Sequence, residues 1–267
     1  MSSIGDKTIE QFGEQWVNYN NIDGYFGSIE LFQDFVVPFD TSKLKDKVVA
    51  DIGAGTGRFT KSILQSGASH VFAVEPSQAV KVVEQVLTEE EKNRTTILNI
   101  PGGELKLNES LDFALSIGVM HHIPEVDDVV KAVYDSLKKD GQFIIWLYGK
   151  EGNRLYLMIF EPIRFITMKM PLFLNHWISF LLNIFLTLYI LIIKMTPFIP
   201  WPMKSYVINV ISKSNWDKRL VVIFDQLNPS YAKYYTKKEA YDLLAKNHFK
   251  TEVFARHGYS WVVIGTK

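Results

Sequence analysis

Short apolar segments alternate with amphipathic segments over much of this chain. Apolar runs of four to seven residues are followed by stretches in which apolar residues recur every three or four positions. The first pattern is typical of buried strands and the second of helices that pack on a sheet. The predicted elements of this part, in chain order, are strand 48–52, helix 59–67, strand 71–74, helix 77–87, strand 96–100, strand 111–117, helix 127–139 and strand 142–148.

The last part of the chain returns to the same alternation. Thr236 and Glu239 have the spacing of a capping box, so a helix is predicted to start there and to run to about Asn247. Two more strands are predicted at 250–256 and 261–266. Together these patterns predict a doubly wound α/β fold with seven strands, mostly parallel, in which the last strand is antiparallel.

Between these parts the chain changes character. From about Gly152 to Leu220 it is apolar and helical in pattern, and 171–193 contains no Asp, Glu, Lys or Arg. As a helix this segment would be roughly 35 Å long, enough for a hydrocarbon core of about 30 Å. A single crossing would separate the last strands from their sheet, so the segment must return to the side from which it started. We therefore divide the chain into three parts: a helical lead-in at 1–40, a sheet domain formed by 41–151 and 221–267, and an apolar helical insertion at 152–220.

Three arrangements of the insertion satisfy this requirement: a cap packed on the domain, a dimer interface, or a hairpin face dipped into a membrane. From 151 to 220 there are eight basic and three acidic side chains, a net charge of +5, so the rest of the neutral chain carries −5. Basic residues around an apolar helix suit an anionic lipid surface, and Trp177, Trp201 and Tyr206 are suitable interfacial anchors. A buried cap explains the apolar composition equally well, but not the charge asymmetry.

Composition narrows the function further. With 267 residues the chain has room for one α/β domain with an insertion. Basic and acidic residues are equal in number and no basic run is present, so we expect no nucleic acid partner. The absence of cysteine excludes disulfides and thiolate chemistry. The first residues lack the pattern of a secretory signal, and we expect a cytoplasmic protein, with peripheral contact at the inner face of the cell membrane if the insertion faces lipid.

Glycines follow the first predicted strand at alternate positions. Asp51 closes that strand, and Gly53, Gly55 and Gly57 follow before a helical pattern begins. Glycine suits such a turn because a side chain would hold the backbone away from a ligand and would disfavour positive φ angles. A dinucleotide-binding turn requires its third glycine where Arg58 stands, so a nicotinamide oxidoreductase is disfavoured.

Glu75 ends the second predicted strand, about 20 positions after the glycines, where doubly wound folds place a carboxylate that accepts the hydroxyls of a ribose. The joint spacing of Asp51, the three glycines and Glu75 resembles the first motifs of the class I S-adenosylmethionine-dependent methyltransferases. The resemblance implies that the turn, including Ala54, passes under the amino acid part of S-adenosylmethionine. It also implies that Asp51 orients the ammonium group and that Glu75 binds the ribose.

The same resemblance implies several further roles. Gly103 stands roughly where relatives have an aspartate near the adenine, so Glu104 or the backbone is expected to substitute for it. Ser116 lies at the end of the fourth strand, beside the cofactor. The lead-in at 1–40 resembles a segment that closes over the cofactor, although packing of its aromatic side chains on the sheet edge explains them equally well. The candidate substrate-binding residues are Tyr25, Tyr148, His257 and Tyr259.

His121 and His122 follow the fourth strand, at the edge of the sheet where doubly wound folds bind ligands. Histidine accepts a proton near neutral pH, and in small-molecule O-methyltransferases with a similar ending such a residue serves as the general base. We expect this role for one of the two, with His121 slightly preferred. The competing interpretation is that they only pack or hydrogen-bond to the turn. No third ligand at suitable spacing accompanies them, so no metal site is expected.

Segments near the end of the chain, Asp225 to Pro229 and Arg256 to Trp261, resemble a bacterial subgroup associated with surface-polysaccharide biosynthesis. The resemblance therefore implies O-methylation of a sugar hydroxyl in a cell-surface glycan precursor. Methylation of a quinone-like or lipid acceptor is the alternative within this class. A membrane-associated protein that binds the cofactor without catalysis is the alternative from another class.

Overall fold

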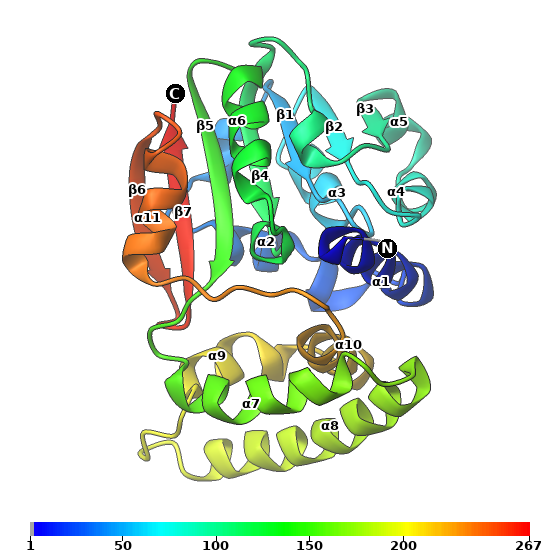
Figure 1. Ribbon diagram of the computed structural model, residues 1–267, viewed down its shortest axis with the longest axis vertical. Helices are drawn as coiled ribbons and strands as arrows, with labels where there is room; N and C mark the ends of the chain where they lie inside the picture. The colour runs from blue at the N-terminus through cyan, green and yellow to red at the C-terminus, as the bar shows by residue number, and fades with distance from the viewer. Residues whose placement is uncertain (1–2) are drawn as a thin grey trace.

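A computed structural model describes residues 3–267, apart from the side chain of Leu172. Seven strands form one twisted sheet in the order β3-β2-β1-β4-β5-β7-β6 (Figure 1). The strands are β1 Val48–Ile52, β2 His70–Val74, β3 Thr95–Leu98, β4 Leu111–Ile117, β5 Leu137–Tyr148, β6 Lys250–Arg256 and β7 Ser260–Thr266. The first five are parallel, and β7 is antiparallel to both of its neighbours. The predicted doubly wound fold is confirmed.

Strand β5 differs from its prediction at one end. It begins at Leu137 rather than at residue 142, because Leu137 pairs with Leu111 of β4 before the register shifts next to Asp112. The preceding helix α6, Val126–Ser136, therefore stops three residues earlier than predicted. Sheet pairing, which no local pattern reveals, decided this boundary.

Helices cover both faces of the sheet. On one face α6 and α11, Lys237–Ala245, contribute side chains such as Val130 and Leu244 to a core with the inner residues of β4, β5 and β7. On the other face α2, Ile29–Val36, and α3, Arg58–Gln65, contribute side chains such as Phe32 and Ile63. Two shorter helices, α4 Val80–Val86 and α5 Glu89–Asn93, lie between β2 and β3 in the chain. The parallel strands are thus buried on both faces, as their continuous apolar runs require.

The predicted capping box at the start of α11 is present. The backbone N–H of Glu239 donates to the Thr236 hydroxyl at 3.2 Å, and the Thr236 N–H donates to the Glu239 carboxylate at 2.8 Å. Two N–H groups that would otherwise lack partners at the helix start are satisfied in this way.

The lead-in predicted at 1–40, of which the first two residues lie outside the described part, contains α1, Ile4–Asn18, the 3-10 helix η1, Gly24–Gly27, and α2. Helix α1 lies near the ends of the central strands, on the side of the sheet domain that meets the insertion (Figure 1). This position brings the lead-in to the edge of the sheet where parallel α/β folds bind ligands.

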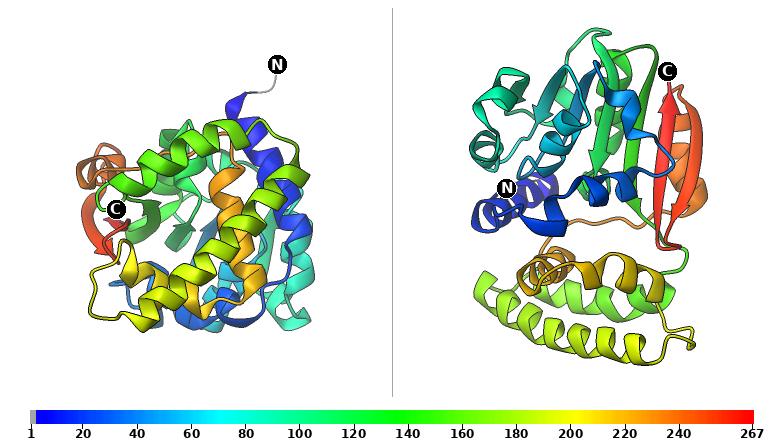
Figure 2. Two further views of the ribbon diagram at one scale, coloured as in Figure 1. Left: turned by 90° about the horizontal axis from the view of Figure 1, so that it is seen from below. Right: turned by 180° about the vertical axis from the view of Figure 1, so that it is seen from behind.

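The insertion forms a separate helical layer below the carboxyl ends of the strands (Figures 1 and 2). Its helices are α7 Arg154–Thr167, α8 Leu172–Met195, α9 Lys204–Asn209 and α10 Trp216–Leu227, with the 3-10 helix η5 at Ile211–Lys213. Helix α10 packs on α8, where the Asn183 side chain donates to the carbonyl of Trp216 at 3.0 Å. The boundary predicted at 220 therefore falls inside α10, and the helical layer extends to Leu227.

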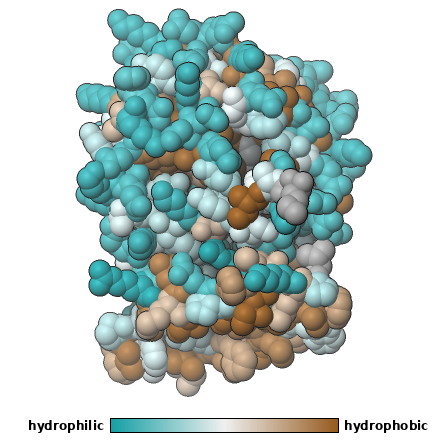
Figure 3. Space-filling model, in the orientation of Figure 1, coloured by the Kyte–Doolittle hydropathy of each residue, from teal (hydrophilic) through white to brown (hydrophobic). Residues whose placement is uncertain are grey.

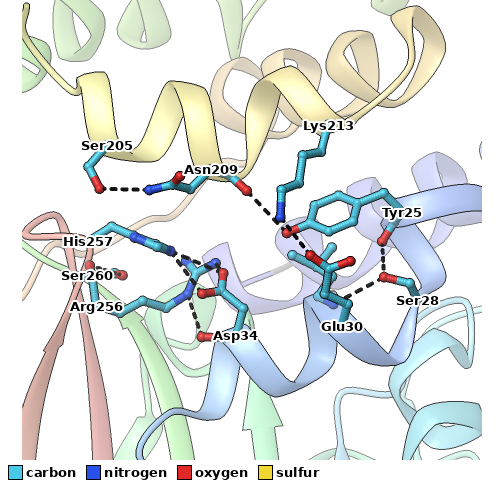
Figure 4. Close-up of polar contacts among 11 residues, drawn as sticks. Tyr25, Ser28, Glu30, Asp34, Ser205, Asn209, Lys213, Arg256, His257 and Ser260 are labelled. Carbon is cyan, nitrogen blue, oxygen red and sulfur yellow. Dashed lines mark hydrogen bonds and ion pairs between the residues drawn. The ribbon is translucent and has the colours of Figure 1, made fainter. Parts of the chain in front are cut away.

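A group of polar contacts, which we call the polar joint, links the lead-in, the helical layer and the β6–β7 turn (Figure 4). Lys213 pairs with Glu30 at 2.6 Å, and the Tyr25 hydroxyl donates to the carbonyl of Asn209 at 3.4 Å. Nearby, Asp34 accepts from the buried guanidinium of Arg256 and lies 3.0 Å from the His257 ring. Three segments far apart in sequence are thereby held together beside the end of the sheet.

The two ion pairs of the polar joint should differ in their contribution to stability. Arg256 is almost completely buried, so Asp34→Ala would leave a buried cation without its partner, and we expect a loss of about 2 to 3 kcal/mol in the free energy of unfolding. Glu30→Ala removes a solvent-exposed pair and should lower the free energy of unfolding much less. Chemical denaturation of both variants measures this difference, and equal losses would contradict it.

Candidate active site

A cavity of about 240 Å³ lies between the carboxyl ends of the strands and the helical layer. Its wall combines the glycine turn after β1, the ends of β2, β4 and β5, the inner side of α1, and residues of α9 and α10. The side chains are mostly apolar or aromatic, and a few polar groups are placed among them. Such a cavity, apolar with a few polar groups, is typical of small-molecule sites.

The glycine turn adopts backbone conformations that require glycine. Gly53 has φ +78°, and a Cβ atom there would lie 2.5 Å from the Val119 side chain. Gly55 has φ +55°, and a Cβ there would point toward the Trp16 indole of α1 at 3.5 Å. Gly53, Ala54 and Gly55 all line the cavity, while Gly57 caps the start of α3. The backbone of the turn is therefore open to a ligand that lies under α1.

Glu75 holds this turn in place. One carboxylate oxygen accepts the Gly55 N–H at 2.9 Å, and the other accepts the Ser77 N–H at 3.0 Å. The side chain is buried and lines the cavity. Because each carboxylate oxygen has a second lone pair, Glu75 supports the turn and can still accept hydrogen bonds from two ribose hydroxyls. These features fit S-adenosylmethionine.

Asp51 lies behind the turn and does not line the cavity. One of its oxygens accepts the Thr60 hydroxyl at 2.6 Å, and burial raises the pKa of its carboxyl to about 6. Ser116 is also placed inside the sheet, where its hydroxyl donates to the Ile52 carbonyl at 3.1 Å and joins β4 to β1. A direct contact of either residue with the cofactor stays a prediction.

The residues expected near the adenine lie in the 3-10 helix η3, Gly102–Glu104. Gly102 lines the cavity, whereas Gly103 and Glu104 line a second, adjoining cavity of about 620 Å³. A Cβ on Gly102 would lie 3.0 Å from side-chain atoms of both Ile52 and Val129. Gly102 therefore lies at the cavity wall, one residue before Gly103, which was expected there from the sequence.

The two histidines differ in their surroundings. His122 lines the cavity, and its Nδ1 lies 2.8 Å from the carbonyl oxygen of Tyr231. Because a carbonyl only accepts, Nδ1 must carry the proton, which leaves Nε2 as a lone-pair acceptor with no partner among residues 3–267. Burial lowers the pKa of His122 to about 4, so its ring is neutral near pH 7.

His121 lies behind the cavity wall and is fully buried. Its ring stacks on that of Tyr148 with 3.7 Å between centroids, and burial lowers its pKa well below the usual value. The sequence slightly preferred His121, but the geometry favours His122.

Of the four candidate substrate-binding residues, the structure brings Tyr148 to the cavity wall. Its hydroxyl accepts from the Gln226 amide at 2.7 Å, so its own proton remains available for a ligand. Tyr25 and His257 belong instead to the polar joint (Figure 4). Tyr259 lies in the β6–β7 turn, where its carbonyl accepts from Asn153 at 2.8 Å.

Several polar residues of the wall were not predicted from the sequence. Arg58 lies between the rings of Phe26 and Phe59, 4.0 and 4.3 Å from their centroids. Asp225 accepts from Gln15 of α1 at 3.0 Å, and burial raises the pKa of its carboxyl to about 6. Asp225 belongs to the segment whose resemblance to relatives was noted, but only the packing of α10 places it in the wall.

Comparison with known proteins agrees with this geometry. The family described as "Methyltransferase domain" matches residues 50–145. A ubiquinone biosynthesis O-methyltransferase from Pelagibacter ubique is 26% identical over 195 residues, which is 67% of this chain and 80% of the relative. A tRNA U34 carboxymethyltransferase from Helicobacter pylori is 27% identical over 110 residues, 40% of this chain and 42% of the relative, so this match extends to less than half of that protein.

Solved structures share the fold. A putative S-adenosylmethionine-dependent methyltransferase from Listeria monocytogenes superposes with a TM-score of 0.52 at 15% identity, covering 90% of this chain and 98% of the other. The magnesium protoporphyrin IX methyltransferase from Synechocystis, solved with bound SAH, gives a TM-score of 0.54 at 15% identity, covering 95% and 93%. The chain thus carries a methyltransferase domain at residues 50–145 and has the fold of the class I S-adenosylmethionine-dependent methyltransferases. Among residues 3–267 no cluster of metal-binding side chains is present.

The role of Glu75 can be tested by calorimetry with S-adenosylhomocysteine. Glu75→Ala removes a carboxylate that supports the turn and faces the cavity, each charged hydrogen bond being worth about 1.5 to 3 kcal/mol. We therefore expect affinity to fall roughly 10- to 150-fold. Asp51→Ala is also expected to weaken binding, by displacing the turn.

Glu84→Ala provides a matched control, because this exposed glutamate of α4 lines neither cavity. Its affinity should stay within about threefold of wild type, less than the effect of one neutral hydrogen bond. Unchanged affinity in the Glu75 variant, with the fold intact, would contradict the assigned cofactor site.

Proposed function

We propose that this enzyme transfers a methyl group to a hydroxyl oxygen of an apolar, ring-bearing acceptor of quinone-like or lipid character. The observation that carries this proposal is the aromatic composition of the cavity wall. Aromatic side chains from four different segments, Phe26, Phe59, Trp146 and Tyr206, face the same space. Aromatic surface of this kind binds flat apolar rings through burial and offset stacking.

The O-methyltransferase from Pelagibacter ubique supports the same acceptor class, because its name places its reaction in ubiquinone biosynthesis. The sugar hydroxyl expected from the sequence is the second candidate. It is favoured by the carboxylate of Asp225, which lines the cavity and can accept hydrogen bonds from hydroxyl groups. In both cases we place the reaction in the cytoplasm.

The residues of the wall have separable tasks in this proposal. S-adenosylmethionine, when bound on the glycine turn, supplies a methyl group activated by its positive sulfur. Glu75 and the turn hold that donor, and the aromatic wall holds the acceptor against it. Alignment of this kind supplies most of the acceleration in a direct transfer. Trp16 and Phe12 of α1 cover the donor side and exclude water.

His122 accepts the proton of the acceptor hydroxyl in this proposal. Its Nδ1–H is held by the Tyr231 carbonyl, so the lone pair of Nε2 is fixed in direction. As the acceptor oxygen gains the methyl group, its proton moves to this nitrogen. A neutral ring is required for the task, and the low pKa of His122 keeps the ring neutral at pH 7.

Replacement of the two histidines should have unequal effects on turnover. His122→Gln removes the proposed base, so we expect kcat to fall roughly 10²- to 10⁴-fold, with cofactor affinity near wild type. His121→Gln changes a residue behind the wall and should mainly lower thermal stability. Turnover is measured with a hydroxylated quinone analogue and with a sugar-phosphate acceptor. Normal turnover of the His122 variant on the better acceptor would exclude its role as base.

The pH dependence of kcat/KM separates His122 from Asp225. A base works only when deprotonated, so activity falls as the pH drops through its pKa. With His122 as base, at a pKa of about 4, the profile should be flat from roughly pH 5.5 to 8. With Asp225 as base, at a pKa of about 6, activity should fall below that pH, and Asp225→Asn should abolish this limb together with most of the turnover. An acid limb near pH 6 that disappears in Asp225→Asn would therefore assign the proton to Asp225, whereas a limb that persists in this variant would come from Asp51, whose pKa is also about 6.

A further inference from the structure

Helix α8 is amphipathic with the reverse polarity of a surface helix in water. Asn175, Ser179 and Asn183, each four residues from the next, are buried against the rest of the protein. The Asn175 amide donates to the Thr167 carbonyl at 2.9 Å, and the Asn183 amide donates to that of Trp216 at 3.0 Å. A surface helix of a soluble domain normally turns its apolar stripe inward and its polar side chains to water. Here the inward stripe is polar in the first half of the helix and becomes apolar only near its end, where Ile190 and Ile193 pack with Val207 and Ile211.

The outward side of α8 is apolar along its whole length. Its exposed large side chains recur every three or four residues and include Phe173, Trp177, Leu181, Phe185, Leu188 and Ile192. Trp177 is 64% exposed and Phe185 is 66% exposed. The helix is apolar and long enough to cross a membrane. Only 22% of its most apolar stretch is buried, so it does not have the burial of a core helix in a soluble domain.

Helix α7 extends this surface. Met158 and Phe165 are 71% and 62% exposed. Seen from below, α7 and α8 diverge from the turn that connects them, and they are the helices farthest from the sheet (Figure 2). In the space-filling view, apolar residues gather at this end of the molecule, whereas the sheet domain is largely hydrophilic (Figure 3). We call the exposed apolar side chains of α7 and α8 the basal face. A contiguous apolar face of this extent marks an interaction site.

Basic residues border the basal face. Lys169 lies in the turn between α7 and α8 with its ammonium 4.0 Å over the Phe165 ring, Lys194 is in the last turn of α8, and Lys204 begins α9. Helix α8 contains no acidic residue. Three of the eight basic side chains of the insertion therefore border the apolar surface, whereas Lys213 belongs to the polar joint and Lys218 is buried.

We propose that the basal face docks on a bilayer that contains anionic lipids, with α8 lying in the plane of the interface. The elements before and after α8 return to the same side as the sheet, which matches a helix that lies on a membrane and does not cross it (Figure 1). Apolar side chains enter the acyl boundary, and the bordering lysines meet the phosphates of the lipid headgroups.

Charge favours this occupant over a second copy of the chain. A symmetric dimer built on the basal face would bring the same surface of both copies together, with their lysines near one another. Like charges oppose such a contact, whereas an anionic lipid surface is complementary to them.

The docking also places the cavity close to the lipid. The same helical layer that presents the basal face contributes Tyr206 and Val210 of the cavity wall from its inner side. Helices α9 and α10, which line the cavity, pack on α7 and α8, so the helical layer lies between the bilayer and the cavity. The docking itself does not depend on which acceptor the enzyme uses.

Vesicle flotation tests the proposal. Purified protein should float with vesicles of phosphatidylcholine mixed with phosphatidylglycerol, and less with phosphatidylcholine alone. The triple variant Lys169→Glu, Lys194→Glu, Lys204→Glu should bind the anionic vesicles on the order of 100-fold more weakly, since each lysine contributes about 1 kcal/mol. The control triple variant Lys43→Glu, Lys139→Glu, Lys237→Glu changes exposed lysines of the sheet domain and should bind like wild type.

A second variant tests the apolar part of the contact. Trp177→Gln with Phe185→Gln removes two outward side chains without altering the inward face, so binding to both kinds of vesicle should fall roughly 10- to 100-fold while the thermal midpoint is maintained. A wild-type protein that floats with neither vesicle would overturn the proposal. A lipid-free dimer, seen by sedimentation velocity and split by this double variant, would also overturn it and assign the basal face to a second copy.

Discussion

The site depends on two hydrogen bonds of Glu75, at the end of β2: one holds the Gly55 N–H of the turn after β1, and the other, from the Ser77 N–H of its own segment, orients the carboxylate. They fix the glycine turn against the neighbouring strand, and the positive φ angles of Gly53 and Gly55 then let the turn pass close to a ligand. The parallel alignment of β1, β2 and β4 brings the other groups of the site to the same edge. Without that alignment, Gly102, Val119 and His122 would not share one cavity.

The inner and outer sides of the helical layer have different roles. Residues on its inner side, such as Tyr206 and Asp225, close the cavity. A minimal sheet domain would leave this cavity open to water. Its outer side is apolar, and its polar residues are turned inward, where they hydrogen-bond to neighbouring helices. An enzyme that recruits an apolar acceptor gains from this arrangement, because the helices of the basal face, α7 and α8, pack directly on α9 and α10, which line the cavity.

Burial governs the chemistry of the cavity wall. It lowers the pKa of His122 to about 4 and raises the pKa of Asp225 to about 6, so at pH 7 both groups are deprotonated and Asp225 is the stronger base of the two. Burial also lowers the pKa of Arg58, which lies between two aromatic rings, to about 10, so its guanidinium is still cationic near pH 7. The wall thus offers one fixed cation and two proton acceptors within an apolar surface.

The sequence by itself determined the fold class, the cofactor and the position of the glycine turn, because these depend on local patterns: apolar strands, glycines at alternate positions and an acidic strand end. It also determined that the insertion must return to its starting side. Only the tertiary structure decided which side chains face the cavity. It placed His122 in the wall and His121 behind it. It also showed that Tyr25 and His257, expected at the substrate, belong to the polar joint. It added Asp225 and Arg58 to the wall and extended the helical layer to Leu227. These outcomes depend on contacts between segments far apart in the chain, and no local pattern encodes the direction of a side chain in such contacts.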